Sequence, residues 1–367
     1  MIKVKTLHAL HQWLGLGLGV WLALVALTGL VWTVWDAVAT SDEPVPSTPC
    51  VEAAGSANWR ATLRAHGERI VRLDALDGGF QQLRVTIMDQ DGAKHIRHVD
   101  RCSGAIVPSP DAWESFFSAV TWLHGSLIPG AIGKLSIGLL GILTFVSIAI
   151  GVWLWWVRNG RSLRKALAIS SSRQGLVRLR SWHYVAGALV TLPMALVVAS
   201  GTLLAYSPWL TETPAIGSHC IDQAQNPQAS IQGLGPYLDS VQRLVGERMP
   251  DGAIRSIRLD AKNCVARIYA QSRSVTPASL NDRLWIDLPG ERVIAHVRGA
   301  ETGVGYRGSA WALVLHSGEL FGRAGWLLTL ASGIALFGLT VTGAWIYFWA
   351  RKMQAQVRAG TRNRAAG

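Results

Sequence analysis

Four histidines recur at matched places in the two halves of this 367-residue sequence, and each stands at a fixed interval before a glycine. The interval is 18 residues from His11 to Gly29 and from His183 to Gly201, and 27 residues from His124 to Gly151 and from His316 to Gly343. Such repeated spacing indicates an internal duplication. Histidines duplicated in this way are candidates for paired metal ligands.

Imidazole is costly inside or beside a lipid bilayer unless it has a partner or a task. Two neutral imidazoles that face each other across a helix bundle can supply both axial ligands of a haem iron, which favours electron transfer over ligand binding. Glycines on neighbouring helices leave room for the porphyrin. The sequence therefore predicts two haem groups. One is assigned to His11 and His183 with Gly151 and Gly343, and the other to His124 and His316 with Gly29 and Gly201.

Other roles stay open for these histidines. Membrane histidines can simply make hydrogen bonds between helices, and glycine is common wherever membrane helices pack. Zinc or copper is less suited, because the pairs lack the Cys, Asp or Glu that would complete a tetrahedral site. His8 lies one turn before His11 and is an alternative to it, although no equivalent histidine precedes His183. The remaining histidines are expected on the surface or in turns: His66, His95, His98, His219 and His296.

Four apolar stretches provide the helices that must position these residues. They cover residues 12–35, 135–157, 182–209 and 324–350, and none contains a charged residue. Each is longer than the ~20 residues that a helix needs to cross a bilayer. The duplication relates the first stretch to the third and the second to the fourth. The expected fold is therefore a membrane protein with a four-transmembrane-helix bundle.

The net charge of +12 is explained by membrane orientation. Basic residues without any acidic residue occupy segments 1–11, 158–181 and 351–367, whereas the charges elsewhere nearly balance. Because basic segments stay cytoplasmic, we expect a bacterial inner-membrane protein in contact with lipid, with both termini in the cytoplasm. This distribution argues against nucleic acid as a partner. Segments 36–134 and 210–323 are then periplasmic.

The two periplasmic segments have matching patterns of short elements, each typical of a small α+β domain. Helices are expected at residues 58–68 and 236–247. Strands are expected at residues 70–76, 83–89, 95–101 and 105–107 in the first segment, and at residues 253–260, 265–271, 284–288 and 292–296 in the second. Each segment should thus contain one helix and a short antiparallel sheet, in a strand order that the sequence does not specify.

All four cysteines fall in the periplasmic segments, two in each. An oxidising compartment favours disulfides over free thiols. We therefore predict the disulfides Cys50–Cys102 and Cys220–Cys264. Four free thiols are the alternative, because pairing within each segment does not follow from spacing alone.

Three motifs carry a resemblance to a known family. Residues 10–16 read LHQWLGL, residues 28–30 read TGL, and residues 315–325 read LHSGELFGRAG. Together with the four apolar stretches, they make the chain resemble the PepSY-associated transmembrane family over nearly its whole length. The resemblance implies PepSY-like periplasmic domains. In the iron-uptake branch of the family it also implies an inner-membrane reductase of ferric siderophores, of the ferrioxamine type, with b-type haems bound at the four histidines.

The expected function is the transfer of electrons across the membrane to a ferric siderophore in the periplasm. A built-in nicotinamide or flavin domain is not expected, because the glycine-rich run at residues 15–19 lies inside an apolar stretch and not at a strand-to-helix turn. The electron donor should then be external, either a quinol or a cytoplasmic reductase. Two other functions fit the same sequence: a haem-free protein whose outer domains bind peptides or regulate a protease, and a transporter of siderophore or haem.

Overall fold

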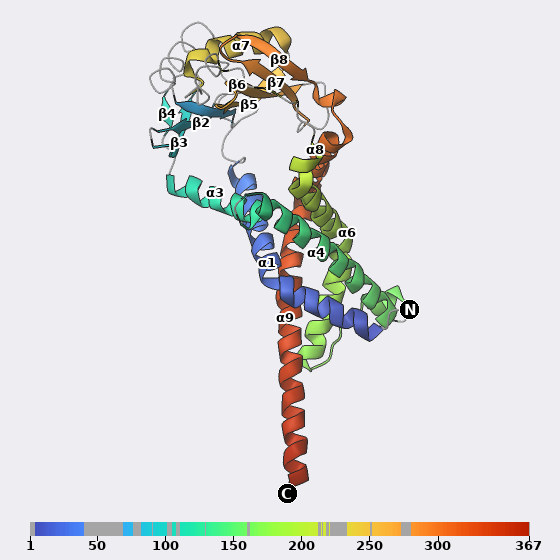
Figure 1. Ribbon diagram of the computed structural model, residues 1–367. Helices are drawn as coiled ribbons and strands as arrows, with labels where there is room; N and C mark the ends of the chain where they lie inside the picture. The colour runs from blue at the N-terminus through green and yellow to red at the C-terminus, as the bar shows by residue number, and fades with distance from the viewer. Residues whose placement is uncertain are drawn as a thin grey trace. The chain divides into compact units, whose positions relative to one another are not determined.

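The computed structural model describes two compact units of the chain (Figure 1). The helical unit comprises Met1–Asp42, Ser115–Trp209 and Ala312–Gly367, and the sheet unit comprises Glu43–Glu114 and Leu210–Trp311. The residues described are 4–39, 69–75, 82–89, 91–100, 105–107, 111–128, 130–159, 162–211, 214, 216–217, 220, 233–249, 252–272 and 280–366. The helix predicted at residues 58–68 and the predicted Cys50–Cys102 disulfide lie outside them.

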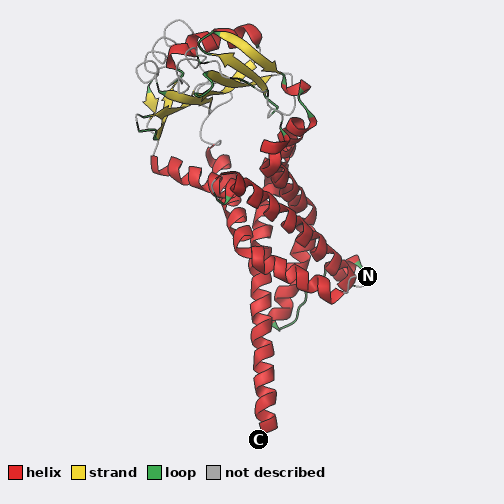
Figure 2. Cartoon of the chain, viewed as in Figure 1, coloured by secondary structure: helices red, strands yellow, loops and turns green. Residues whose placement is uncertain are grey.

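Four long helices dominate the helical unit, as Figure 2 shows. They are α1 (Val4–Ala39), α4 (Gly130–Arg158), α6 (Gly175–Leu210) and α9 (Gly322–Ala366). All four are long and apolar enough to cross a membrane, which confirms the predicted spans. Large apolar side chains on them face outward, including Val20 at 76% exposure and Leu192 at 71%. Because such surface is stable in lipid and not in water, the protein is a membrane protein.

The four helices contact one another in a closed order. Gly19 of α1 lies against Thr340 of α9, and Gly187 of α6 lies against Leu339 of α9. On the other side, a Cβ at Gly138 of α4 would lie 2.6 Å from the ring of Tyr206 of α6. Helix α1 also packs on α4. Small residues at these contacts let the backbones approach closely, as is usual between membrane helices.

Two shorter helices precede the second and fourth spans and carry a histidine each. They are α3 (Asp111–Ser126), which contains His124, and α8 (Val304–Ser317), which contains His316. Both histidines thus lie on separate helices that precede the second and fourth spans, and not at the outer ends of those spans. The chain turns between the two helices of each pair, because Leu127 (φ 56°) directly after α3 and Gly318 (φ 84°) directly after α8 adopt left-handed conformations, which end an α-helix.

A pair of glycines equivalent in the duplication makes these turns compact. A Cβ at Gly325 would collide with the carbonyl oxygen of Gly318, and one at Gly133 would collide with that of Ile128. A side chain at either position would therefore push the short helix away from the span that follows. These glycines keep the histidine-bearing helices close to the bundle.

The sheet unit is built on one antiparallel sheet of eight strands in the order β4-β3-β2-β1-β5-β6-β7-β8. The strands from the first segment are β1 (Ile70–Ala75), β2 (Gln82–Met88), β3 (Lys94–Asp100) and β4 (Ile106–Val107). Those from the second are β5 (Gly252–Asp260), β6 (Val265–Ser272), β7 (Asp282–Asp287) and β8 (Arg292–Val297). All eight predicted strands are present, with ends that differ by at most two residues.

The two segments share this sheet, whereas the sequence had predicted a separate sheet in each. The first strand of each segment lies at the centre, where Leu73 of β1 pairs with Ile257 of β5. Each segment then continues outward as a meander, so the strand order is symmetrical about the β1–β5 pair. The duplication thus extends to the sheet.

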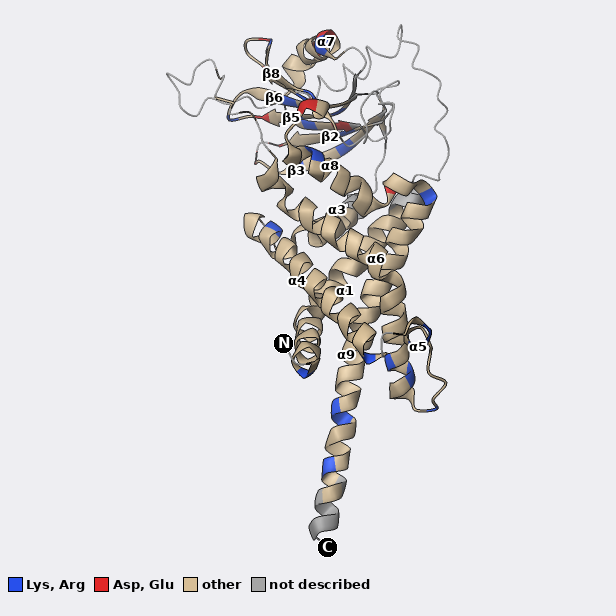
Figure 3. Cartoon of the chain, turned by 90° about the vertical axis from the view of Figure 1, so that its right-hand side faces the viewer, with Lys and Arg blue, Asp and Glu red and all other residues tan. Residues whose placement is uncertain are grey.

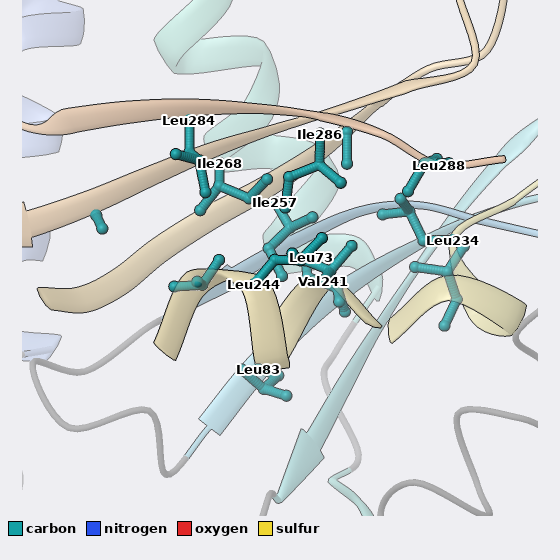
Figure 4. Close-up of a cluster of buried hydrophobic side chains, with 14 of the residues drawn as sticks. Leu73, Leu83, Leu234, Val241, Leu244, Ile257, Ile268, Leu284, Ile286 and Leu288 are labelled. Atoms are coloured by element: carbon teal, nitrogen blue, oxygen red, sulfur yellow. The ribbon is translucent and has the colours of Figure 1, made fainter. Parts of the chain in front are cut away.

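One face of the sheet packs against helix α7 (Leu238–Arg248) to form the core of this unit (Figure 4). Val241 and Leu244 of the helix lie among Leu73, Ile268 and Leu284 of the strands. Burial of each such side chain contributes about 1.5–3 kcal/mol. The predicted disulfide between Cys220 and Cys264 is confirmed, and its Cα atoms are 5.1 Å apart.

Candidate functional site

His124 and His316 face each other inside the helical unit, and their ring centres are 5.9 Å apart. The Nδ1 atom of His124 lies 2.9 Å from the carbonyl oxygen of Val25 on α1. The Nδ1 atom of His316 lies 2.9 Å from the carbonyl oxygen of Val197 on α6. Val25 and Val197 occupy equivalent places in the duplication, so the two histidines are held in the same way.

These contacts determine which ring nitrogen carries the proton. A carbonyl oxygen can only accept, so Nδ1 of each neutral ring must be the protonated donor and Nε2 must keep its lone pair. Two rings in this tautomer have no Nε2–H to offer, and therefore His124 and His316 do not hydrogen-bond to each other. These histidines could instead serve only to link helices through hydrogen bonds. That alternative explains the hydrogen bonds of Nδ1, but it gives the Nε2 lone pair no partner.

The spacing of the two rings suits a shared metal ion. Two metal–imidazole bonds of about 2 Å each, with about 1 Å from each Nε2 to its ring centre, place ring centres about 6 Å apart. The observed 5.9 Å agrees, with the rings inclined by 45°. Burial, with a smaller effect from His316, lowers the pKa of His124 to about 4. His124 is therefore neutral near pH 7, as a metal ligand must be.

A glycine lies against each of these two rings. A Cβ on Gly29 of α1 would lie 2.9 Å from Cε1 of His124, and one on Gly201 of α6 would lie 2.7 Å from Cε1 of His316. Real Cβ atoms essentially never approach so closely. Both positions therefore need glycine if the rings are to stay where they are. We call this group of four residues the His124 level.

His11 and His183 form a second group with the same construction. The Nδ1 atom of His11 lies 3.0 Å from the carbonyl oxygen of Ser147 on α4 and 3.1 Å from its hydroxyl oxygen. The Nδ1 atom of His183 lies 2.9 Å from Oγ1 of Thr342 on α9. Thr342 Oγ1 donates its own proton to the carbonyl oxygen of Gly338, 2.7 Å away, so it accepts from His183. Both rings thus carry the proton on Nδ1.

Glycines complete this second group, which we call the His11 level. A Cβ on Gly151 would lie 3.0 Å from Cε1 of His11, and one on Gly343 would lie 3.4 Å from Cε1 of His183. Each of the four glycines singled out from the sequence therefore lies against one histidine of the group to which the sequence assigned it.

The two levels lie far apart along the bundle. His11 and Gly29 belong to one continuous helix and are 18 residues apart, which corresponds to about 27 Å. This distance is close to the ~30 Å thickness of the hydrocarbon core. One pair of imidazoles therefore lies toward each end of a membrane span.

The other histidines that the structure describes take no part in these levels. His8 is on the exposed side of α1, whereas His11 is partly buried against α4, so the geometry favours His11 over His8. His95 lies in the sheet unit, where its Nε2 is 3.0 Å from Oδ2 of Asp89. His98 and His296 are on strands β3 and β8 of the same unit. His66 and His219 lie outside the described residues.

Sequence reasoning missed the groups that accept hydrogen bonds from Nδ1. Two of them, the carbonyls of Val25 and Val197, cannot be recognised from a sequence, because every residue has a backbone carbonyl. Thr342 could have been recognised, because it directly precedes Gly343, just as Thr28 precedes Gly29 and Ser200 precedes Gly201. Thr28 Oγ1 and Ser200 Oγ indeed lie 3.3 Å and 3.5 Å from the Nδ1 atoms of His124 and His316.

The residues of both levels fit a haem with two axial histidines. Haem iron receives four ligands from the porphyrin, so two imidazoles complete its coordination. Within the described part of the chain, no cluster of three or more His, Cys, Asp or Glu side chains suits a metal ion. A pair of imidazoles has too few ligands for a tetrahedral zinc site. The donor set therefore suits haem better than a bare metal ion.

Comparison with known proteins agrees with this architecture. The model of the family described as "PepSY-associated TM region" matches residues 8–352, which include the apolar stretches of all four spans, both levels and the whole sheet. A search of curated proteins found no match. Because the family match covers nearly the whole chain, this protein belongs to the PepSY-associated TM region family.

Proposed function

We propose that this protein is an inner-membrane haem protein that passes electrons across the bilayer and reduces a ferric siderophore in the periplasm. The observation that carries the proposal is the shared tautomer of four histidines, which leaves an Nε2 lone pair on every ring, together with the facing rings of His124 and His316. His11 and His183 would hold one haem b, and His124 and His316 would hold the other. Haem held by these residues would supply reversible one-electron transfer.

The chain's own residues fix the ligands before any iron binds. Hydrogen bonds from Nδ1 set both the orientation and the tautomer of each ring, and such bonds raise the basicity of the other nitrogen. Gly29, Gly201 and Gly151 let the rings lie against neighbouring helices without a steric clash. Two levels separated by about 27 Å place one ligand pair toward each membrane face, which is the arrangement that transmembrane electron transfer requires.

Reduction of ferric to ferrous iron takes one electron, and siderophores hold ferrous iron weakly, so reduction would release the metal. The electron would come from an external donor, either a quinol or a cytoplasmic reductase. Basic residues on α5 (Leu163–Ala166) and at the C-terminal end of α9 gather at the end of the helical unit that carries the N-terminus (Figure 3). This distribution supports a cytoplasmic location for that end.

A haem assay on the purified protein tests the proposal. A pyridine haemochrome measurement should give about two haems per chain, and dithionite should shift the Soret band of both. The reduced protein should then convert a ferric siderophore to ferrous iron, trapped by a ferrous-specific chelator. Preparations from haem-sufficient cells that contain no porphyrin would exclude the proposal in favour of a haem-free or transport role.

Removing the hydroxyl of Thr342 is expected to loosen the haem at the His11 level. In Thr342→Val, Nδ1 of His183 loses its acceptor, and the loss of such a partner typically weakens metal binding about 10- to 100-fold. Haem dissociation to apomyoglobin measures the effect. Thr342→Ser keeps the hydroxyl and should bind haem like the wild type. Equal dissociation rates in the valine and serine variants would show that Thr342 does not orient the ring.

A further inference from the structure

The sheet face opposite α7 carries arginines in register across three neighbouring strands. Arg72 on β1 pairs with Arg258 on β5, and Arg258 pairs in turn with Arg267 on β6. Residues paired in this way have side chains on the same face of a sheet. Their chain neighbours Leu73 and Ile257 belong to the core beneath α7, so the arginines lie on the other face. Figure 3 shows basic residues on β5 and β6 in blue.

The two outer arginines of this row are each paired with an acidic side chain. Arg72 Nε lies 2.6 Å from Oδ2 of Asp74, and Arg267 contacts Asp260. Among the residues that the structure describes, no carboxylate lies within salt-bridge distance of Arg258. Like charges directly opposite one another destabilise a sheet. A local cost of this kind is typical of a functional surface.

Aromatic rings lie beside the arginines on the same face. The guanidinium of Arg258 is 4.9 Å from the ring centre of Tyr269, and its Nε donates to Oγ of Ser256 at 3.2 Å. Farther along, the guanidinium of Arg283 lies 4.2 Å from the ring centre of Tyr306, which covers it. The centre of the face remains open, since the side chains of Arg72 and Arg267 are 44% and 43% exposed.

We propose that this arginine face binds the substrate and that the substrate is an anionic ferric chelate, with carboxylate or phenolate oxygens around the metal. The inference rests on the proposed function and narrows its substrate class. Guanidinium groups pair with such oxygens through two parallel hydrogen bonds, and arginine does so better than lysine. The neighbouring tyrosine ring offers a flat surface to the carbon skeleton of the ligand.

The geometry favours a compact anion over an acidic peptide. Adjacent strands are about 4.8 Å apart, so the three arginines span about 10 Å across the sheet. A chelate gathers several anionic oxygens around one metal within that distance. An extended peptide would instead present same-side carboxylates about 7 Å apart along its own axis, and peptides usually add to the edge of a sheet and not to its face.

Binding of gallium(III) citrate to the full chain in detergent tests this inference. Gallium(III) is redox-inert under these conditions, so binding is measured without electron transfer. Arg258→Gln is expected to raise Kd about tenfold, as the loss of one charge-assisted hydrogen bond predicts. Higher salt should also weaken binding to the wild type. The gallium complex of a ferrioxamine-type trihydroxamate, which has no net negative charge, should bind more weakly than the citrate complex.

Two variants serve as controls. Arg243→Gln removes a 53% exposed arginine from α7, on the opposite side of the sheet, and should leave Kd unchanged. Arg258→Lys keeps the charge but loses the paired hydrogen bonds of the guanidinium, so its Kd should lie between those of the wild type and Arg258→Gln. Equal losses in Arg258→Gln and Arg243→Gln would overturn the inference. So would tighter binding of the trihydroxamate complex, or displacement of gallium citrate by a lower concentration of polyglutamate peptide.

Failure of this inference is distinguishable from failure of the proposed function, because haem is quantified in the same preparation. A chain with about two haems that binds no anionic chelate refutes the arginine face alone. A chain without haem that binds gallium citrate through Arg258 refutes the redox role alone.

Discussion

His124→Ala is expected to reduce the haem content from about two per chain to about one, and His11→Ala to do the same at the other level. In each variant one axial imidazole is lost, and a single remaining ligand does not hold a buried haem in its low-spin, two-histidine state. Reduction of a ferric siderophore should fall at least about 100-fold in both variants, since each level serves the same electron transfer. Haem per polypeptide and the low-spin signal in electron paramagnetic resonance measure the loss.

His8→Ala is the matched control for His11→Ala, because it removes an exposed histidine one turn away on the same helix. It should keep both haems and full activity. A variant that lacks His11 but retains both haems, together with a His8→Ala variant that loses one, would move the ligand to His8. A wild-type haem content in both His124→Ala and His316→Ala would rule out the His124 level altogether.

Gly201→Ala is expected to weaken haem binding at the His124 level about 10- to 100-fold, which corresponds to the 1–3 kcal/mol typical of an overpacked site. The added Cβ would lie 2.7 Å from Cε1 of His316, so the ring would have to move away from its partner. The equivalent distances grow along the series Gly29, Gly151 and Gly343, from 2.9 Å to 3.0 Å and 3.4 Å. Haem dissociation rates of the four alanine variants should fall in the same order.

Gly17→Ala provides the comparison for this series, because nothing lies within 4 Å of the added Cβ. It should bind haem like the wild type, and it should slightly stabilise α1, since alanine is the better helix former by about 1 kcal/mol. Faster haem loss from Gly343→Ala than from Gly201→Ala would contradict a steric role for these glycines.

Short-range patterns predicted the elements of this fold well. Alternation of apolar and polar residues located strand β6 at residues 265–271, where the structure has Val265–Ser272. The pairing of β1 with β5 could not be predicted, because it joins strands from opposite halves of the chain and depends on contacts that no local pattern records. The helix ends were also missed: apolarity ends near residue 350, but the Arg, Gln and Ala that follow are good helix formers and α9 continues to Ala366.

The residues of the site that could be predicted were those that recur in both halves of the duplication. Matched spacing singled out His11 and His183 with their glycine partners, because two independent copies make a chance coincidence improbable. The same reasoning had no access to the Nδ1 acceptors. A backbone carbonyl such as that of Val25 is present at every position, and only the packing of α3 on α1 shows that this one is used.

Each level contains one imidazole from each half of the chain. The central strand pair of the sheet likewise contains one strand from each half. A chain with a single half would offer only one axial ligand per level, and its first strand would have an unprotected edge. Such a chain would have to form a two-fold homodimer to complete any of these features. Fusion of the halves into one polypeptide makes complete sites independent of protein concentration, and it frees the two copies to differ in sequence.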